Sequence, residues 1–420
     1  MMGTTFKKSI AILLGLSMLL VLFMANIGAS AEEKVNIRFM YEAPWVDHPS
    51  IMKLQAVIEE KFNPTHPNIE VTLMPLFNAT QNEQVIKQAI SGSNDFDVAC
   101  VSYAGVGITA ASGSLMDLTG KVDDVNASVF GSLLDLCTYK GQQYIVPWWQ
   151  DCRVLGVNKN MFEDAGLQYP TTLEEMANAA KAFKEKGMNG FVTPGSIDAI
   201  IPCEWQILLT NNGGRIVNDV DGEPVGGLDT PEGVEWMEMM QILYDSMPND
   251  GIAYEWGAYA AALGSGGAAM GFAVPGFLDN EQFNYEGGPT IEWIVTPAGR
   301  AGSTSLVGGY GLGIVSTTKY PDEALTFLKF LLEPEVNATC LIDLPVVMDS
   351  YQYAPFNSDM YDVFFEQFKT AGPYYVNVLS RDGQVTQALY PVMTEGLINR
   401  TPAEELAKKC NDAVNRAIGE

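Results

Sequence analysis

Hydrophobic and polar residues follow strand and helix periods from the beginning of the folded chain. Residues 35–41 alternate with a period of two and predict a strand, and Ile69–Leu76 predicts a second one. Residues 51–62 place apolar side chains at helical spacing, and Gln81–Ser91 predicts another helix. Residues 97–103 are apolar throughout, which is typical of a strand covered on both faces. This β-α-β-α-β order predicts a mostly parallel sheet wrapped by helices.

The same alternation of helix and strand signals continues to the C-terminus. Thr172, followed by Glu174 and Glu175, predicts the start of a helix, and Pro231 suits the first turn of another. Further elements are expected as strands at 293–297 and 308–316 and as helices at 321–332 and 401–418. The whole pattern therefore indicates an α/β protein.

One stretch in the middle of the chain, residues 139–162, combines strand and site signals. A short apolar strand is expected to stop at Pro147, because proline has no N–H to give to a ladder. Trp148, Trp149 and Asp151 follow at once. Each buried indole N–H needs a hydrogen-bond partner. Paired aromatic residues and an acid at the end of a strand therefore predict one side of a binding site for a ligand with apolar and hydroxyl faces. The alternative is one tryptophan in the core and the other at the surface.

Composition narrows the possible partners. The 420 residues include 51 acids and 24 bases, for a net charge of −27. Such a surface repels nucleic acid and anionic lipid, so neither is expected as a partner. The charge does not require a cationic ligand, because solubility accounts for it equally well. The length predicts two or more folding units.

The N-terminus has the pattern of an export signal. Lys7 and Lys8 precede an apolar stretch at 10–24, and small residues at 29–31 suit a cleavage site. We expect residues 1–31 to be a signal peptide cleaved after Ala31, which gives an exported protein of the periplasm. No cysteine follows the apolar stretch, so a lipid anchor is not indicated.

The cysteines are compatible with either disulfides or buried thiols. They are Cys100, Cys137, Cys152, Cys203, Cys340 and Cys410. An even number in an exported chain permits pairing, and Cys137 with Cys152 is the pair we favour. Several of the others lie in apolar runs, which is typical of a buried free thiol.

Four segments together resemble a known family. They are residues 96–119, 139–176, 263–277 and 307–335, of which 139–176 is the most specific. In this order they resemble the extracellular solute-binding proteins of ATP-driven importers, in the group that includes maltose-, trehalose- and polyol-binding members. The likeness covers nearly all of the chain after the expected signal peptide.

The resemblance implies a periplasmic-binding-protein fold of type II, with two discontinuous lobes joined by a hinge. Lobe 1 would hold residues 32–146 and 296–333, and lobe 2 residues 147–295 and 334–420. A carbohydrate ligand would lie between the lobes and favour their closure, since hinge closure around ligands is known for such proteins. The closed monomer would then dock on the transmembrane subunits of an ABC permease.

The candidate site residues are aromatic or charged side chains near strand ends and loops. Aromatic faces pack on sugar rings, and carboxylates accept bonds from hydroxyls. The set is Tyr41, Glu42, Trp45, Tyr103, Trp148, Trp149, Asp151, Trp205, Trp256, Phe277, Tyr310 and Arg381. Trp205 has helical spacing and suits the core equally well, whereas Trp236 and Trp293 are interpreted as structural. Arg381 stands about where maltodextrin-binding members carry an aromatic residue, which argues against a glucose oligomer.

Catalytic and metal motifs are lacking in the sequence. Its two histidines, His48 and His66, lie in separate loops, with no H-E-x-x-H or G-x-S-x-G motif. Asp219–Gly222 imitates a calcium loop, but Leu228 stands where a glutamate should be. We therefore expect no enzyme, no cofactor and no metal. Two alternatives stay open: a receptor for a polyamine or another cationic solute, and a secreted glycoside hydrolase, because paired carboxylates cannot be identified by inspection.

Overall fold

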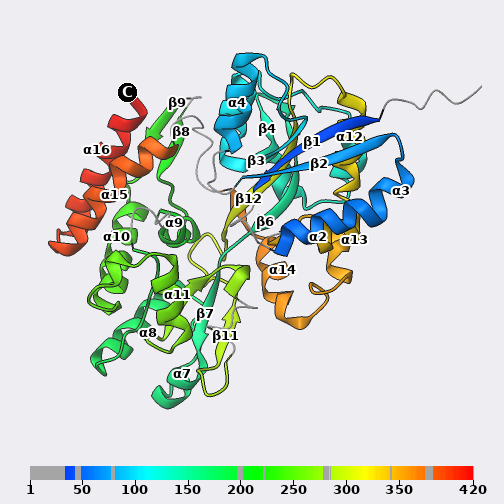
Figure 1. The fold of residues 1–420 in the computed structure, drawn as a ribbon. Coiled ribbons are helices and arrows are strands. Elements are labelled where there is room, and N and C mark those ends of the chain that lie inside the picture. The colour runs from blue at the N-terminus through cyan, green and yellow to red at the C-terminus, as the bar shows by residue number, and fades with distance from the viewer. Residues whose placement is uncertain are drawn as a thin grey trace, which may run out of the picture.

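The computed structural model describes residues 34–42, 49–76, 81–195, 202–220, 223–277, 283, 285–340, 343–373 and 382–419. These residues form two lobes, each built from separate parts of the chain (Figure 1). The expected signal peptide, Trp45 and Arg381 lie outside the described residues, as does the side chain of Trp256. Within the described chain, no helix combines the length and apolar character needed to cross a bilayer.

Lobe 1 is organised around a mixed sheet in the order β13-β6-β12-β3-β1-β2, with β14 paired to β12. The strands are β1 (Val35–Glu42), β2 (Ile69–Leu76), β3 (Val98–Ser102), β6 (Ile145–Asp151), β12 (Leu306–Ile314), β13 (Leu344–Pro345) and β14 (Gly372–Pro373). β1 is parallel to β2 and β3, whereas β12 is antiparallel to both β3 and β6. The carboxyl ends of β1, β3 and β6 therefore share one edge of the sheet with the start of β12.

Helices cover this sheet and close the core of lobe 1 (Figure 1). They are α2 (Pro49–Val57), α3 (Asn63–Thr65), α4 (Gln81–Ser91), α5 (Val106–Ala111), α6 (Asp123–Asn126), α12 (Pro321–Phe330), α13 (Pro334–Thr339) and α14 (Asp362–Phe368). A small hairpin pairs β4 (Thr138–Tyr139) with β5 (Gln142–Gln143). Phe39 of β1 illustrates the packing, since it contacts Trp148 and Phe327 edge to face at centroid distances of 5.4 and 5.5 Å.

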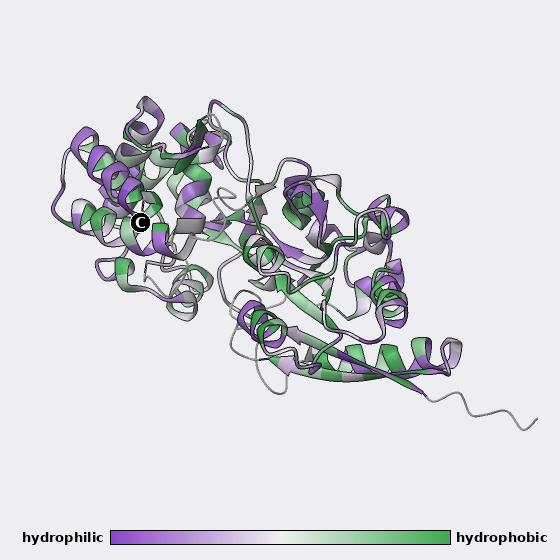
Figure 2. Ribbon diagram, turned by 90° about the horizontal axis from the view of Figure 1, so that it is seen from above, coloured by the Kyte–Doolittle hydropathy of each residue, from purple (hydrophilic) through white to green (hydrophobic). Residues whose placement is uncertain are grey.

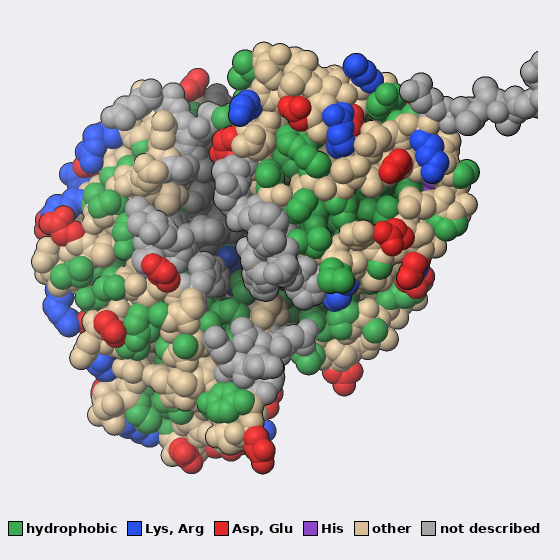
Figure 3. Space-filling view, viewed as in Figure 1, with side chains coloured by type: hydrophobic (Ala, Val, Ile, Leu, Met, Phe, Trp, Pro, Cys, Tyr) green, Lys and Arg blue, Asp and Glu red, His purple; other side chains and the backbone are tan. Residues whose placement is uncertain are grey.

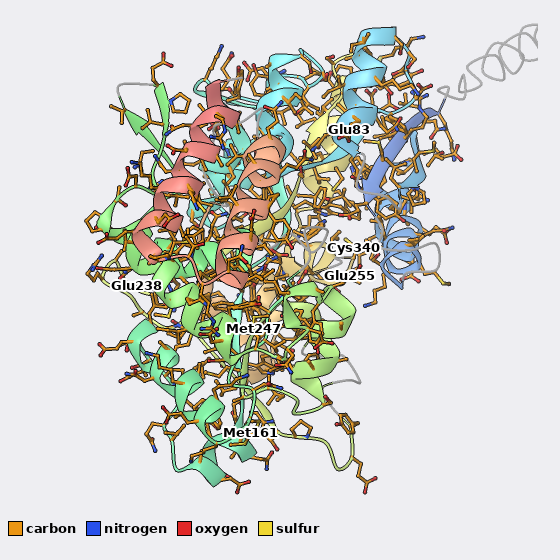
Figure 4. All side chains as sticks on the ribbon, turned by 90° about the vertical axis from the view of Figure 1, so that its left-hand side faces the viewer. Glu83, Met161, Glu238, Met247, Glu255 and Cys340 are labelled. Atoms are coloured by element: carbon orange, nitrogen blue, oxygen red, sulfur yellow. The ribbon has the colours of Figure 1, made fainter. Side chains whose placement is uncertain are left out.

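Lobe 2 has a smaller sheet, β10-β7-β11, in which both outer strands are antiparallel to β7. Its strands are β7 (Val154–Asn158), β10 (Met270–Ala273) and β11 (Ile291–Ile294), with a hairpin of β8 (Val217–Val220) and β9 (Glu223–Gly226). Its helices are α7 (Lys159–Ala165), α8 (Leu173–Glu185), α9 (Pro202–Asn211), α10 (Pro231–Ser246), α11 (Trp256–Gly264), α15 (Asp382–Ile398) and α16 (Ala403–Gly419). In Figure 4, Met161 of α7 and Glu238 of α10 mark this lobe, and Glu83 of α4 marks lobe 1.

Local sequence explains how these helices begin and end. The predicted start of α8 is confirmed as a reciprocal cap: Glu175 N–H donates to Thr172 Oγ1 at 3.2 Å, and Thr172 N–H donates to the Glu175 carboxylate at 3.2 Å. Gly187 follows the helix with φ of 76°, a conformation that glycine adopts without strain. Along the outer helices, Figure 2 shows hydrophilic residues alternating with hydrophobic ones, as amphipathic helices on a core require.

Two expectations about the course of the chain are wrong. β6 does not stop at Pro147 but continues to Asp151, because Pro147 lies before the part of β6 that pairs with β13. The lobe boundaries also differ from those expected. Residues 334–371 pack on lobe 1 instead of lobe 2, since β13 pairs with β6 and Phe364 and Phe368 enter the lobe 1 core.

The expected Cys137–Cys152 disulfide is also wrong. Both residues are free and fully buried, as are the other thiols that the structure describes, those of Cys100, Cys340 and Cys410. The Cys137 thiol instead donates to the Leu133 carbonyl at 3.4 Å. These cysteines therefore behave as small apolar residues of the two cores.

Candidate functional site

The candidate site lies at the edge of the lobe 1 sheet from which the chain crosses to lobe 2. Here Tyr310 of β12 stands between Ser102 of β3 and Trp149 of β6. Two residues earlier on β12, Gly308 stands opposite Asp151, the last residue of β6. Strand register therefore brings together residues that are more than 150 positions apart. Ligands of α/β folds bind at such carboxyl edges and between domains.

Tyr310 and Trp149 form an aromatic pair at this edge. Their ring centroids are 4.9 Å apart with an interplanar angle of 32°. Trp149 is only 7% exposed, whereas Tyr310 is partly exposed, so Tyr310 presents the accessible ring and Trp149 supports it. The Tyr103 hydroxyl donates to the Trp149 carbonyl oxygen at 3.3 Å and holds the strand behind the pair. The arrangement offers an apolar ring face to a ligand.

Two carboxyl groups lie beside this aromatic pair. Burial raises the pKa of Glu42 above its usual value, the Tyr310 hydroxyl lowers it, and the Asp151 carboxylate raises it further. Asp151 keeps 20% of its side chain accessible, and its Oδ1 accepts from the Gly308 N–H at 2.9 Å. Glu42 and Asp151 thus supply oxygens that can accept hydrogen bonds from hydroxyl groups.

Arg153 lies directly behind Asp151, where β6 ends and β7 begins. It is 3% exposed and forms two ion pairs at 2.8 Å: Nη1 with Asp151 Oδ1, and Nε with Glu204 Oε1 of α9. Burial raises the pKa of Glu204, and Arg153 opposes that shift. Burial also raises the pKa of Asp343 well above its usual value, and the Asp151 carboxylate adds to the effect. Arg153, Glu204 and Asp343 were not among the site residues predicted from the sequence.

Some expected site residues lie elsewhere. Trp148 is 1% exposed and packs against Phe39, so it belongs to the core of lobe 1, although its neighbour Trp149 packs against Tyr310. Tyr41 is equally buried beside Phe39, at a centroid distance of 5.5 Å. Including Trp148 and Tyr41 among ligand contacts was wrong, because neither side chain reaches the surface.

Two further candidates from lobe 2 are also packed inside. Trp205 is 1% exposed in the lobe 2 core, and its carbonyl oxygen accepts from the Trp236 indole N–H at 2.8 Å. Phe277 is 7% exposed and stacks on Phe283 at 4.7 Å, with Tyr259 at 5.3 Å. Trp205 is therefore a core residue rather than a ligand contact, and Phe277 belongs to an aromatic cluster.

The aromatic pair and the carboxylates lie where the two lobes face each other. Figure 3 shows the two lobes side by side on the face turned toward the viewer. The chain crosses between them at residues 152–153, after β6, and again at 295–305, before β12. Among the described residues, no group of three or more His, Cys, Asp and Glu side chains is arranged to hold a metal ion. The site therefore offers ring faces, hydroxyls and carboxylates for binding.

Comparison with known proteins agrees with this architecture. A family model described as bacterial extracellular solute-binding protein matches residues 48–338. The diacetylchitobiose binding protein DasA of Streptomyces coelicolor is 26% identical over 267 residues, which span 60% of this chain and 59% of DasA. The match thus covers less than two thirds of that relative's length.

Solved structures show the same fold at lower identity. The GacH receptor of Streptomyces glaucescens, studied unliganded and with acarbose, matches with a TM-score of 0.73 at 21% identity, over 92% of this chain and 100% of that one. A solute-binding protein of Agrobacterium radiobacter K84 in complex with ribitol gives 0.71 at 21% identity, over 92% and 99%. The two-lobed periplasmic-binding-protein fold is therefore present. Because the family model matches more than half of the residues, the chain belongs to the bacterial extracellular solute-binding proteins.

Proposed function

We propose that this protein is the substrate-binding receptor of an ABC importer and that it captures a sugar or polyol between its lobes. Tyr310, supported by Trp149, would pack on the apolar face of the ligand. Glu42 and Asp151 would accept hydrogen bonds from its hydroxyls. The ligand would bridge the lobes, favour the closed state through its higher affinity for that state, and be delivered to the permease.

The observation that carries this proposal is the pairing of a partly exposed ring with two carboxyl groups at one sheet edge. An aromatic face buries the C–H surface of a sugar ring, and carboxylates make charge-assisted bonds to its hydroxyls. Tyr310, Glu42 and Asp151 supply both kinds of contact. The printed names of the relatives, which mention diacetylchitobiose, acarbose and ribitol, support a hydroxyl-rich ligand.

A calorimetric screen with a matched pair of tyrosine variants tests the proposal. The panel is maltose, diacetylchitobiose, acarbose and ribitol, against wild type, Tyr310→Ala and Tyr144→Ala. Tyr144 is the control, because it is also partly exposed and lies just before the opposite end of β6, where its hydroxyl donates to Gln142 at 3.2 Å. We expect Tyr310→Ala alone to weaken binding, by about 1–3 kcal/mol. Equal affinity of both variants for every bound sugar would contradict the proposed site.

A cationic solute is the second candidate, and the carboxyl groups favour it. The Asp151 carboxylate raises the cost of ionising Glu42, and Arg153 forms its two ion pairs with Asp151 and Glu204. A ligand amine between Glu42 and Asp151 would relieve that repulsion. Putrescine and spermidine belong in the same calorimetric panel. Binding of these amines that weakens with added salt, without binding of any sugar, would favour this candidate.

We also propose export to the periplasm, with cleavage after Ala31. Family membership supports an exported protein, and the basic, apolar and small-residue order of residues 7–31 supports a cleaved signal peptide. The mass of the intact protein recovered from a secreting host tests this. A mature chain beginning at Glu32 is expected, and a chain that retains residues 1–31 would contradict the cleavage.

A further inference from the structure

Arg153 lies on the first crossing, and its side chain contacts residues of both lobes. It follows β6 of lobe 1 by two residues and precedes β7 of lobe 2 by one. Its backbone N–H donates to Ser305 Oγ at 2.8 Å, and Ser305 lies on the second crossing, just before β12. The residue thus ties two of the crossings together through its main chain.

The guanidinium of Arg153 joins the ligand edge to lobe 2. Nη1 contacts Asp151 Oδ1 at 2.8 Å, and the same oxygen accepts from the Gly308 N–H at 2.9 Å. Nε contacts Glu204 Oε1 at 2.8 Å, and Glu204 is 1% exposed on α9 of lobe 2. A planar guanidinium with several fixed donors can hold two carboxylates in this way, whereas a lysine ammonium is a single point charge.

Such a buried network is costly unless it is well paired. Taking charges out of water is unfavourable, so a buried ion pair is weak evidence of a role in stability alone. Here the pairs join a partly exposed carboxylate at the ligand edge to a buried carboxylate of the other lobe. Any shift of α9 relative to β6 must stretch one of the two contacts, because both end on one rigid guanidinium.

We propose that Arg153 is a positioning residue of the ligand site: it fixes Asp151 at the sheet edge and couples that carboxylate to Glu204 of lobe 2. The inference rests on the ligand site proposed above. A ligand that contacts Asp151 then affects the position of α9 through Arg153. Conversely, the relative position of the lobes affects the geometry of the contact between Asp151 and the ligand. Arg153 itself does not touch the ligand.

Amide exchange at Gly308, followed by NMR, tests the positioning role without any ligand. The variants are Arg153→Lys and Glu204→Gln, both of which keep the approximate size of the side chain. In each, Asp151 loses part of its anchor, and the Gly308 N–H is expected to exchange at least about tenfold faster than in wild type. The control is Arg300→Lys, since Arg300 also pairs with two glutamates, Glu235 at 2.7 Å and Glu232 at 3.6 Å, but on the exposed surface.

Affinity provides the second readout, with diacetylchitobiose and ribitol as the probes. If the coupling exists, Glu204→Gln and Asp151→Asn have non-additive effects on affinity, by at least about threefold. Additive effects, together with unchanged Gly308 exchange in both Arg153→Lys and Glu204→Gln, would overturn the inference. If neither probe binds wild type while Gly308 exchange accelerates as expected, the positioning role stands and the choice of sugar ligand fails.

Discussion

Replacing each of the two adjacent tryptophans of β6 by alanine is expected to have a different main effect: loss of stability for Trp148 and loss of ligand affinity for Trp149. Trp148 is 1% exposed and packs edge to face on Phe39, whereas Trp149 packs at a tilt against the partly exposed ring of Tyr310. The extra residue at the β-bulge between β6 and β12 is Trp148, since Tyr310 pairs with Trp149 and Gly311 pairs with Pro147. Trp148 therefore packs in the lobe 1 core, and Trp149 supports the Tyr310 ring on which we propose the ligand packs.

The magnitudes follow from this packing. Trp148→Ala leaves a large cavity in the lobe 1 core and is expected to lower the free energy of unfolding by about 3–5 kcal/mol. For a lobe of about 200 residues, each kcal/mol shifts the melting temperature by about 2–4 °C. Trp149→Ala is also expected to destabilise the fold, because Trp149 is 7% exposed. It additionally releases Tyr310, which is expected to reduce affinity by about 1–3 kcal/mol, or about 5- to 150-fold.

The assay combines thermal unfolding with calorimetric titration of diacetylchitobiose, maltose and ribitol, at a temperature well below both melting transitions. Affinity is expected to fall in Trp149→Ala and to change less than about twofold in the folded fraction of Trp148→Ala. Trp148→Phe serves as a milder control, since it keeps a ring against Phe39. If the two alanine variants lost affinity equally, or if only Trp148→Ala lost it, the assignment of the two side chains would be refuted.

Three other outcomes can be measured. Burial and Asp151 raise the pKa of Glu42, so the contribution of Glu42 to the free energy of unfolding is complete below its unfolded pKa and is lost as the pH rises through its folded pKa. Glu42→Gln should therefore flatten the pH dependence of the melting temperature between these two pKa values. An unchanged slope would contradict the raised pKa. Thr172→Ala should cost about 0.5–2 kcal/mol in denaturant unfolding by removing the α8 cap, whereas Thr65→Ala, which is equally exposed but caps no helix start, should cost less. Cys137 and Cys152 should react with a thiol reagent only after unfolding, because burial raises the pKa of both; rapid labelling of the native protein would contradict their burial.

Local patterns predicted the elements well, because periodicity and caps act over a few residues. Strand β1, helix α4 and the cap at Thr172 all follow from neighbouring residues. The predicted strand end at Pro147 was wrong, since proline is tolerated in a strand where no ladder bond is required, and this depends on where β13 begins. The wrong boundary at residue 334 has a similar cause, because tertiary contacts such as the pairing of β13 with β6 assign that segment to lobe 1.

The site was harder to predict than the fold. Aromatic residues near strand exits identified Trp149 and Tyr310, but adjacency could not tell which of Trp148 and Trp149 faces the core, because the bulge decides it. Arg153 and Glu204 are 51 positions apart, and nothing in either local sequence distinguishes them from solvated charges. Their pairing depends on how α9 of lobe 2 packs beside the crossing, which is a tertiary property.

The central claim is that a hydroxyl-rich ligand brings the two lobes together over Tyr310 and Asp151. Small-angle X-ray scattering of the protein, without ligand and with saturating concentrations of whichever panel sugar binds most tightly, tests it most directly. The account predicts a smaller radius of gyration in the presence of that sugar, and in Tyr310→Ala the same decrease only at a higher sugar concentration, in proportion to its weaker binding. A radius of gyration that stays the same when calorimetry shows wild type to be fully occupied would contradict it.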